Sequence, residues 1–481
     1  MNTNNIYSKK HKGSAVVYAL VMLTAVLIIL SSMIGYVASQ IKYSQQSASR
    51  EESLQIAEAG IYFYRWYLAH EVEGKTAQQI KEFWENDDTL GINTPYEREY
   101  KDPYGSGIGR FRITVTPPED YSTIVIVQSE GWTYQHPESK RTVKVRFRRP
   151  SWSEYAVLSN SDVRFGDGTE VFGPIHSNGG VRFDGVIHNL ITSTKSTYID
   201  PDSGQTKPGV WTAWSNEYNT NMNSNVFLAG KQYPVSSQDF NGVTADLALM
   251  KSAAQSTGTY FDDYKEGRHI KLKTDGTFDI RTVKKYHSHF YNIIQYKGSW
   301  SNHPIPDNGV IYVEDNVWLE GKVNNKKVTI VAANLIGGSH PNIFIQHNIE
   351  YSHYDGSDII GIIAQGDIEV IRDSENNLRI DGALLAQTGR VGRKYYSLRH
   401  IWWWWTYCPC GQSWCEDHKD TITIYGSIVS NQRYGFAWLD GCPRSTGYTH
   451  RNLNYDNNLL YYPPPYFPTG TQYSLDLWDE L

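Results

Sequence analysis

The sequence has few charged residues, few cysteines and a single long apolar run. Asp, Glu, Lys and Arg make up 20% of its 481 residues, below the level of about 25% that is usual in globular domains. The mild formal net charge of −6 gives no basic footprint for nucleic acid. A negative mean hydropathy and only one apolar run exclude a protein that lies mainly within a membrane. The length suffices for two or three folded units.

Common catalytic motifs are also missing. The chain has no G-x-S-x-G, H-E-x-x-H or Walker-type sequence, which are the marks of several large enzyme classes. Asp355, Asp358, Asp367 and Glu369 could supply the paired carboxylates of glycoside hydrolysis, but nothing in the sequence separates them from carboxylates of turns. We expect no enzymatic activity and no cofactor.

Aromatic residues are abundant by contrast. They make up 14% of the chain, with 35 Tyr and 15 Trp. Aromatic side chains pack well on pleated surfaces, so this composition favours a β-rich extracellular protein.

The N-terminus carries the clearest signal. Residues 1–13 are polar and end in Lys9-Lys10-His11-Lys12-Gly13, and an uncharged run, SAVVYALVMLTAVLIILSSMIGYVA, covers 14–38. About 20 helical residues span a bilayer, and the lysines before the run hold that end in the cytoplasm. We expect a transmembrane helix with everything after Ala38 outside the cytoplasm.

The apolar run continues directly into a second helical pattern. A cleaved secretory signal would have a shorter apolar region and a cleavage site behind it, and neither is present. One helix over about 14–70 would be roughly 80 Å long at 1.5 Å per residue. Its second half has an apolar stripe with helical spacing: Leu54, Ala57, Ile61, Tyr64 and Leu68.

These features together resemble the type IV pilin family. The segments GSAVVYALVMLTAVLIILSS and LQIAEAGIYFYRW look like the N-terminus of PilX-type pilus assembly proteins. The resemblance implies cleavage by a prepilin peptidase between Gly13 and Ser14, and partnership with other pilins and the pilus assembly machinery. The alternative at this point is an ordinary single-pass anchor that is never cleaved.

One position departs from the family pattern. Pilins usually carry Glu at the fifth mature position, where this chain has Tyr18. In the family that carboxylate is thought to pair with the terminal amine of a neighbouring subunit, and a buried amine without a partner is costly. Tyr18 therefore favours a minor or tip subunit over a repeated shaft subunit.

Residues 39–150 are expected to form a small pilin-like α+β unit. A helix and a loop are predicted over 75–105, followed by three antiparallel strands at 109–117, 122–134 and 141–149, which are rich in Val, Ile and aromatic residues. The apolar face of the long helix would cover one side of this sheet.

Residues 151–481 have a different, repetitive character. Val163-Arg164-Phe165 recurs as Val181-Arg182-Phe183. The pattern Gly-x-(Ile/Leu)-x-(Ser/Ala)-(Asn/Gln) begins at Gly173, Gly382 and Gly426, with a looser copy at Ile360. Repeat units of roughly 20 residues suggest stacked coils, with Asn or Gln ladders at equivalent corners. We expect a mostly-β domain, preferably a right-handed β-helix, with a β-sandwich as the alternative.

Two insertions and a tail complete this second part. An insertion is predicted at about 195–305, with a helix at 242–256, and a Cys- and Trp-rich insertion at about 396–419. The Pro-rich tail is expected to cap the open end of the core, since Pro463–Pro465 cannot join a sheet interior. The runs DFNGVTADLALMK, GVIYVEDNVWLEG and RIDGALLAQ again resemble PilX-type proteins.

The second insertion holds most of the cysteines. Cys408, Cys410, Cys415 and His418 provide enough ligands for tetrahedral zinc, but their spacing matches no common zinc module. Outside the cytoplasm, disulfides that also involve Cys442 are the preferred expectation, and each would stabilise by roughly 2–4 kcal/mol. Free thiols are the third alternative.

Four consecutive tryptophans, Trp402, Trp403, Trp404 and Trp405, precede these cysteines. They either plug the core beneath the Cys-rich loop or form a surface for sugar rings or a partner protein.

Weaker metal signals lie elsewhere. Asp373, Glu375, Asn376 and Asn377 offer oxygen ligands for calcium, although a plain loop is the preferred interpretation. His287 and His289 would share one face of a strand, with His303 also in this insertion, but packing against aromatic residues is the preferred role.

The resemblance implies a structural function. We expect a single-pass membrane protein with a short cytoplasmic N-terminus that enters a pilus-like filament at the cell surface, with a tip position and adhesion to a surface or glycan. The alternatives are an anchored adhesin or carbohydrate-binding protein without a pilus, a polysaccharide-acting β-helix enzyme, and a pseudopilin of a secretion system.

Overall fold

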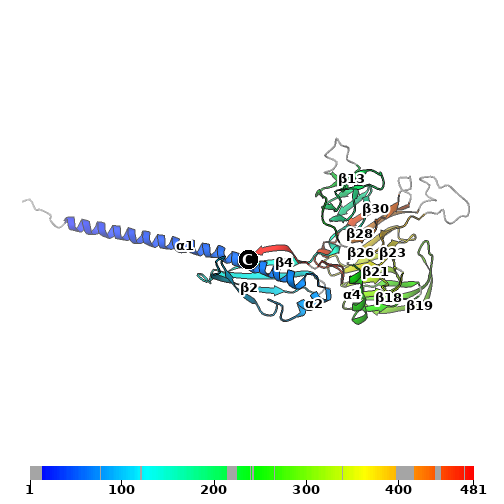
Figure 1. The fold of residues 1–481 in the computed structure, drawn as a ribbon, viewed down its shortest axis with the longest axis horizontal. Coiled ribbons are helices and arrows are strands. Elements are labelled where there is room, and N and C mark those ends of the chain that lie inside the picture. Colours follow the sequence, from blue (N-terminus) through cyan, green and yellow to red (C-terminus); the bar gives the residue numbers. More distant parts are fainter. Residues whose placement is uncertain are drawn as a thin grey trace, which may run out of the picture.

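The structure is a computed structural model. It describes residues 14–75, 77–119, 122–213, 225–238, 240, 243–264, 266–338, 340–396, 417–438, 446–470 and 472–481. A long N-terminal helix leads into a small sheet, and a large β-rich region follows at the far end of that sheet (Figure 1).

The N-terminal part is a helix packed on an antiparallel sheet. Helix α1 runs unbroken from Ser14 to Val72, and the short helix α2 (Ala77–Glu85) follows. The sheet has the order β1-β2-β3-β4-β31. Its first four strands are β1 (Tyr96–Lys101), β2 (Gly107–Thr116), β3 (Ile124–Thr133) and β4 (Arg141–Arg148). The predicted long helix and strands β2 to β4 are confirmed, whereas the sequence prediction missed β1.

The predicted apolar stripe attaches α1 to this sheet. Ala57, Ile61, Tyr64 and Leu68 are at most 1% exposed and pack with side chains of β2, β3 and β4, while Leu54 is partly buried in the same cluster.

Two glycines let the helix approach the sheet closely. A Cβ atom on Gly131 of β3 would lie 2.3 Å from the backbone oxygen of Ser53 and 2.4 Å from the backbone nitrogen of Ala57. A Cβ on Gly60 of the helix would lie 2.2 Å from Ser129 Oγ. Because these two glycines have no side chains, the helix can lie this close to the sheet.

The fifth strand of this sheet comes from the C-terminus. Strand β31 (Ser474–Glu480) pairs antiparallel with β4, and the C-terminus lies beside the helix (Figure 1). Residues 151–481 therefore do not all belong to the second part, and the tail does not end as a cap. Two features of β31 favour its pairing with β4. It carries three large apolar side chains, those of Leu475, Leu477 and Trp478, and its Asp476 forms an ion pair with Arg146 of β4 at 2.6 Å.

The second part is built on parallel strands stacked in two main columns. Column A runs through ten strands and column B through eight, with β26 and β28 long enough to contribute to both. Column A contains β16 (Thr259–Phe261), β20 (Val310–Val313), β22 (Lys327–Ala332), β24 (Ile359–Ala364), β26 (Asn377–Ala386), β28 (His418–Ser430), β5 (Val157–Ser159), β8 (Ile175–Ser177), β11 (Ile191–Ser193) and β15 (Lys231–Gln232). Column B contains β17 (Gly267–Leu272), β21 (Asn316–Val323), β23 (Ile343–Tyr351), β26, β28, β30 (Thr446–Asn454), β7 (Thr169–Phe172) and β10 (Val186–Ile187).

Shorter sets of strands complete the coils. Parallel pairing joins β25 (Ile368–Val370) to β23 and β27 (Val391–Gly392), and joins β6 (Val163–Phe165), β9 (Val181–Phe183) and β14 (Val210–Trp211). Antiparallel additions are the β12 (Thr197–Ile199) and β13 (Thr206–Pro208) hairpin, β18 (Thr277–Tyr286) with β19 (Ile293–Pro304), and β29 (Ala437–Trp438). We call the whole parallel assembly the stack.

The sequence repeats fall in register within the stack. Val163, Arg164 and Phe165 pair with Val181, Arg182 and Phe183 respectively. Gly382 pairs with Gly426, and both have a φ near +145°, where a Cβ would also collide with the neighbouring strand's backbone. The repeated glycine marks the bend at which one long strand passes from column B to column A.

The chain enters the stack in its middle. Strand β5, the first in sequence, pairs with β28, and β7 pairs with β30 near the end of the sequence. Strands β5 to β15 build one end of the stack, helix α4 (Val243–Ser256) leads back, and strands β16 to β30 build the other end toward the first coil. In Figure 1 the β13 and β19 ends therefore lie far apart.

Both sides of column A are buried from β20 to β5. Its inward side chains belong to the main core of the stack, and its outward side chains form a second cluster, in which Leu247 and Met250 of α4 and Leu459 and Phe467 of the tail cover the strands. This double burial explains uninterrupted apolar strands such as Ile359–Ala364.

The predicted boundaries of the first insertion and the role of the tail require correction. Strands β14 to β17 lie within the 195–305 range but pair with the stack, so that range is not one continuous insertion. The tail passes the short helices η1 (Trp152–Glu154) and η4 (Asn457–Leu460) and crosses the side of column A, where Thr329 Oγ1 donates to the Pro465 carbonyl at 2.6 Å.

Candidate functional site: the exposed helix and its junction with the sheet

The first half of α1 is apolar and exposed along its whole circumference. Tyr18 and Met22 are 71% and 72% exposed, and no Asp, Glu, Lys or Arg occurs between Ser14 and Ile41. The helix is long and apolar enough to cross a membrane. An uncharged helix with no polar face requires an apolar environment on all sides, which no described part of this chain supplies.

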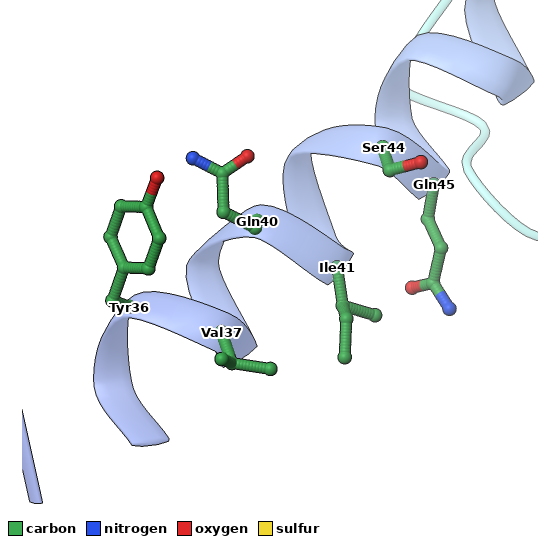
Figure 2. Close-up of a pocket in the computed structure, with 6 residues that line it drawn as sticks. All are labelled: Tyr36, Val37, Gln40, Ile41, Ser44 and Gln45. Atoms are coloured by element: carbon green, nitrogen blue, oxygen red, sulfur yellow. The ribbon is translucent and has the colours of Figure 1, made fainter. Parts of the chain in front are cut away.

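The character of the helix surface changes between Tyr36 and Gln45. Figure 2 shows Val37 and Ile41 directed to one side, with Gln40 and Ser44 on the following turns. These residues line a shallow, open depression on the helix surface. The depression marks the boundary between the fully apolar half and the amphipathic half.

Docking onto the sheet begins one turn later. Ser49 is buried, and its hydroxyl lies 2.7 Å from Thr133 Oγ1 at the end of β3. Farther along, burial raises the pKa of Tyr64 well above its usual range. Helix and sheet thus form one rigid unit from Ser49 to Val72, while the preceding helix stands free.

Several predicted site residues fall outside the described part of the chain: Gly13, the four tryptophans Trp402 to Trp405, and the cysteines Cys408, Cys410, Cys415 and Cys442. Ser14 is the first residue of α1. The disulfide, zinc and surface-aromatic hypotheses therefore stay predictions.

The four carboxylates considered for catalysis have separate local partners. Asp355 accepts from Ser357 in a turn. Buried Asp358 accepts backbone N–H groups of Lys326, Ser352 and His353. These bonds hold turns between coils in place.

The other two carboxylates also bind neighbouring backbone. Asp367 accepts from the Arg390 N–H at 2.9 Å. Glu369 is 1% exposed, accepts from Tyr396 Oη at 2.9 Å and from the Lys394 N–H at 2.5 Å, and burial raises its pKa to about 7. Each links one coil to the next.

The groups considered for calcium and for a histidine site are also dispersed. Asp373 accepts from Asn292, Glu375 lies 2.6 Å from His347, and Asn376 accepts from the Asp420 N–H. Asn377 begins β26.

The histidine prediction needs correction. His287 and His289 do not lie on a strand, because β18 ends at Tyr286. His287 instead caps a turn by accepting from backbone N–H groups and stacks on Phe290. His303 packs against Phe278. The predicted packing against aromatic residues is confirmed for His287 and His303.

A buried carboxyl pair was missed by the sequence analysis. Asp381 and Asp456 are at most 1% exposed, and burial raises the pKa of each. Tyr354 Oη donates to Asp381 at 2.9 Å, and Tyr425 Oη donates to Asp456 at 3.2 Å. The bond between Tyr425 and Asp456 fastens the start of the tail to the stack, whereas Asp381 binds within the stack. The sequence gives no signal of this burial, since the tyrosines that donate to the two carboxyls lie 27 and 31 residues away.

No family model matches the chain, and no curated protein matches it. Among solved structures, the crystal structure of the competence-associated pilin ComZ from Thermus thermophilus matches with a TM-score of 0.33 and 13% identity, over 90% of this chain and 97% of that chain.

Proposed function

We propose that this protein is a subunit of a type IV pilus-like filament. The observation that supports this is the continuity of α1, in which an exposed, uncharged segment and a sheet-docked segment form one 59-residue helix. An ordinary anchor needs no rigid connection between membrane and folded unit. A subunit that must leave the membrane and pack its helix in a bundle does need one.

The proposed sequence of events follows from the helix surface. The precursor waits in the membrane with its basic end in the cytoplasm, a prepilin peptidase cuts between Gly13 and Ser14, and the assembly machinery draws the helix into a bundle with other pilins. Packing in the bundle then replaces lipid contacts around the apolar segment, which requires no chemistry from this chain.

The shape and orientation of the stack support a tip position in the filament. We take the stack to be a right-handed β-helix rather than a β-sandwich, since its main pairs are parallel and such connections are nearly always right-handed. The stack extends across the direction of α1 (Figure 1), and such a width is hard to repeat along a close-packed shaft. Tyr18, in place of the usual Glu, supports the same position.

A structural rather than catalytic role completes the proposal. The carboxylates considered for catalysis serve turns or join coils, as their hydrogen bonds show individually. A buried carboxylate occupied in this way cannot leave its partners without loosening the stack.

The decisive experiment identifies the first residue of the mature protein by mass spectrometry, in protein from cells with and without prepilin peptidase. A peptidase-dependent start at Ser14 is expected. As a control, Gly35→Ala alters a glycine with no atom within 4 Å of the added Cβ and should be processed normally, whereas Gly13→Val should not. A mature protein that begins at Met1 would leave an uncleaved anchor.

The tip position has its own test. Sheared filaments should contain far fewer copies of this chain than of the shaft subunit, and antibodies to the stack should label filament ends. Labelling along the whole filament would contradict a tip position but not filament membership.

A further inference from the structure

A row of uncharged amides runs along one corner of the stack. Residues 332, 364, 386, 430, 159, 177 and 193 are paired in parallel register at the ends of their column A strands. Ala333 follows the first of these positions. Each of the other six positions is followed by a residue whose side chain carries an amide or a hydroxyl. We call these six the amide ridge: Gln365, Gln387, Asn431, Asn160, Asn178 and Thr194.

The ridge is fixed by hydrogen bonds between coils. Asn160 Nδ2 donates to Asn431 Oδ1 at 2.7 Å, and Asn178 Nδ2 donates to Asn160 Oδ1 at 2.8 Å. A side-chain amide has two N–H donors and two acceptor lone pairs. Each of these bonds uses one, so exposed Asn160 keeps a second donor and a second acceptor directed away from the ladder. Asn160 is therefore held in place without being saturated.

One end of the ridge opens into a polar hollow. A hollow of about 720 Å³ is lined by three ridge residues and by five of their neighbours: Asn160, Asn178 and Thr194, with Lys195, Val235, Ser237, Gln238 and Phe240. Here the backbone of Gln238 already binds an amide of the ridge: its N–H donates to Asn178 Oδ1 at 2.9 Å, and its carbonyl accepts from Asn178 Nδ2 at 2.7 Å. An extended polar chain with adjacent donors and acceptors can thus be held by this corner.

We propose that the amide ridge binds an uncharged polysaccharide chain that lies along the axis of the stack. Neighbouring coils are spaced at about 4.8 Å, which is close to the advance of one sugar ring in an extended glycan. A polypeptide strand advances about 3.4 Å per residue and would lose register with the ridge after a few coils. The six ridge positions carry no charge, and Lys195 is the one charged residue among those that line the hollow, so the ridge itself favours a neutral polymer over an acidic one. A sugar hydroxyl, as donor and acceptor, matches the remaining capacity of Asn160.

The test uses the full chain in a zwitterionic detergent, because a detergent with a sugar headgroup would compete. Native gels are cast with dextran, laminarin, hydroxyethyl cellulose or galactomannan as neutral probes, and with polygalacturonate as the acidic probe. We expect retardation by at least one neutral polymer and none by polygalacturonate. Asn160→Ala, which removes one hydrogen-bonding group, should weaken retardation about fivefold.

The matched control is Asn452→Ala. Asn452 is an exposed amide that also bonds across coils, to Thr423, but on column B. Its replacement should change neither the melting temperature nor the retardation, and Asn160→Ala should melt within a degree or two of the parent. The proposal is overturned by an absence of retardation in every neutral gel, by equal retardation of the parent and Asn160→Ala, by stronger binding to polygalacturonate, or by full displacement of the polysaccharide with a Ser/Gly peptide.

Discussion

Replacement of Gly131 by alanine tests the contact that joins α1 to its sheet. The added Cβ would lie 2.3 Å from the Ser53 carbonyl oxygen and 2.4 Å from the Ala57 nitrogen. Both are backbone atoms of a helix and cannot rotate away. An ordinary contact needs at least 3.4 Å, so the helix must move out by about 1 Å along its docked length. Overpacking of this kind costs roughly 1–3 kcal/mol.

Hydrogen exchange by mass spectrometry measures this cost in the full chain. A loss of about 2 kcal/mol would raise the local opening equilibrium up to about 30-fold, in peptides from 53–72 and from β3, while peptides of the stack stay unchanged. Gly435→Ala is the control, because nothing lies within 4 Å of a Cβ there and its φ is ordinary. Exchange in Gly131→Ala that equals the parent across 53–72 would refute the close-approach argument.

Three other changes have definite expected results. Deletion of residues 472–481 removes β31 and the 2.6 Å ion pair of Arg146, so exchange should rise in β4 and the soluble part should aggregate through the newly exposed edge; unchanged exchange in β4 would show that β31 adds nothing. Burial and the neighbouring carboxyl of Asp263 raise the pKa of Asp315 to about 8, far above the unfolded value near 4, so the folded state holds a proton that it loses as pH rises to 8. Stability should therefore decline from about pH 4 to pH 8 in the parent, by at most about 1.4 kcal/mol per pH unit, and less steeply in Asp315→Asn, as denaturant titrations at each pH would reveal; parallel profiles would contradict the assignment. Phe165→Ala removes a ring whose centroid lies 4.6 Å from that of a neighbouring ring in the core, and should cost about 3–5 kcal/mol in unfolding of the stack; a cost below about 1 kcal/mol would show that the coil closes over the gap.

The elements that sequence patterns predicted well are those whose partners lie close in the chain or repeat. The long helix required only a local apolar pattern. The Val-Arg-Phe repeat pairs across 18 residues, and the glycine pattern marks bends where a Cβ has no room. The predicted Asn ladder is present from Asn431 to Asn178.

What sequence patterns missed depends on long-range partners. Strand β31 pairs with β4 more than 320 residues earlier, and its charge pair with Arg146 has no local signature. Strand β1, YEREYK, is too polar to suggest a strand: its tyrosines pack at the margin of the core, and its charged side chains form ion pairs such as Glu97 with Arg112. The buried pair of Asp381 and Asp456 likewise acquires its environment only when the tail returns. The exposed half of α1 is different, because its uncharged sequence alone predicted that it would need an apolar environment outside the described chain.

The return of β31 makes the stack an insertion between the last two strands of the sheet. Two segments connect the parts, and they run side by side: Ser151 bridges Thr469, and the Gly470 N–H donates to the Pro150 carbonyl at 2.8 Å. Both segments meet the stack near its middle, where the first and last coils pair. A load on either end of the stack is therefore carried to β4 and β31 together, and these adjacent strands resist it through their shared hydrogen bonds. Tyr473 and Trp478 of the returning segment also pack against the core between helix and sheet, so this segment stabilises the helix and sheet as well as joining the stack to them.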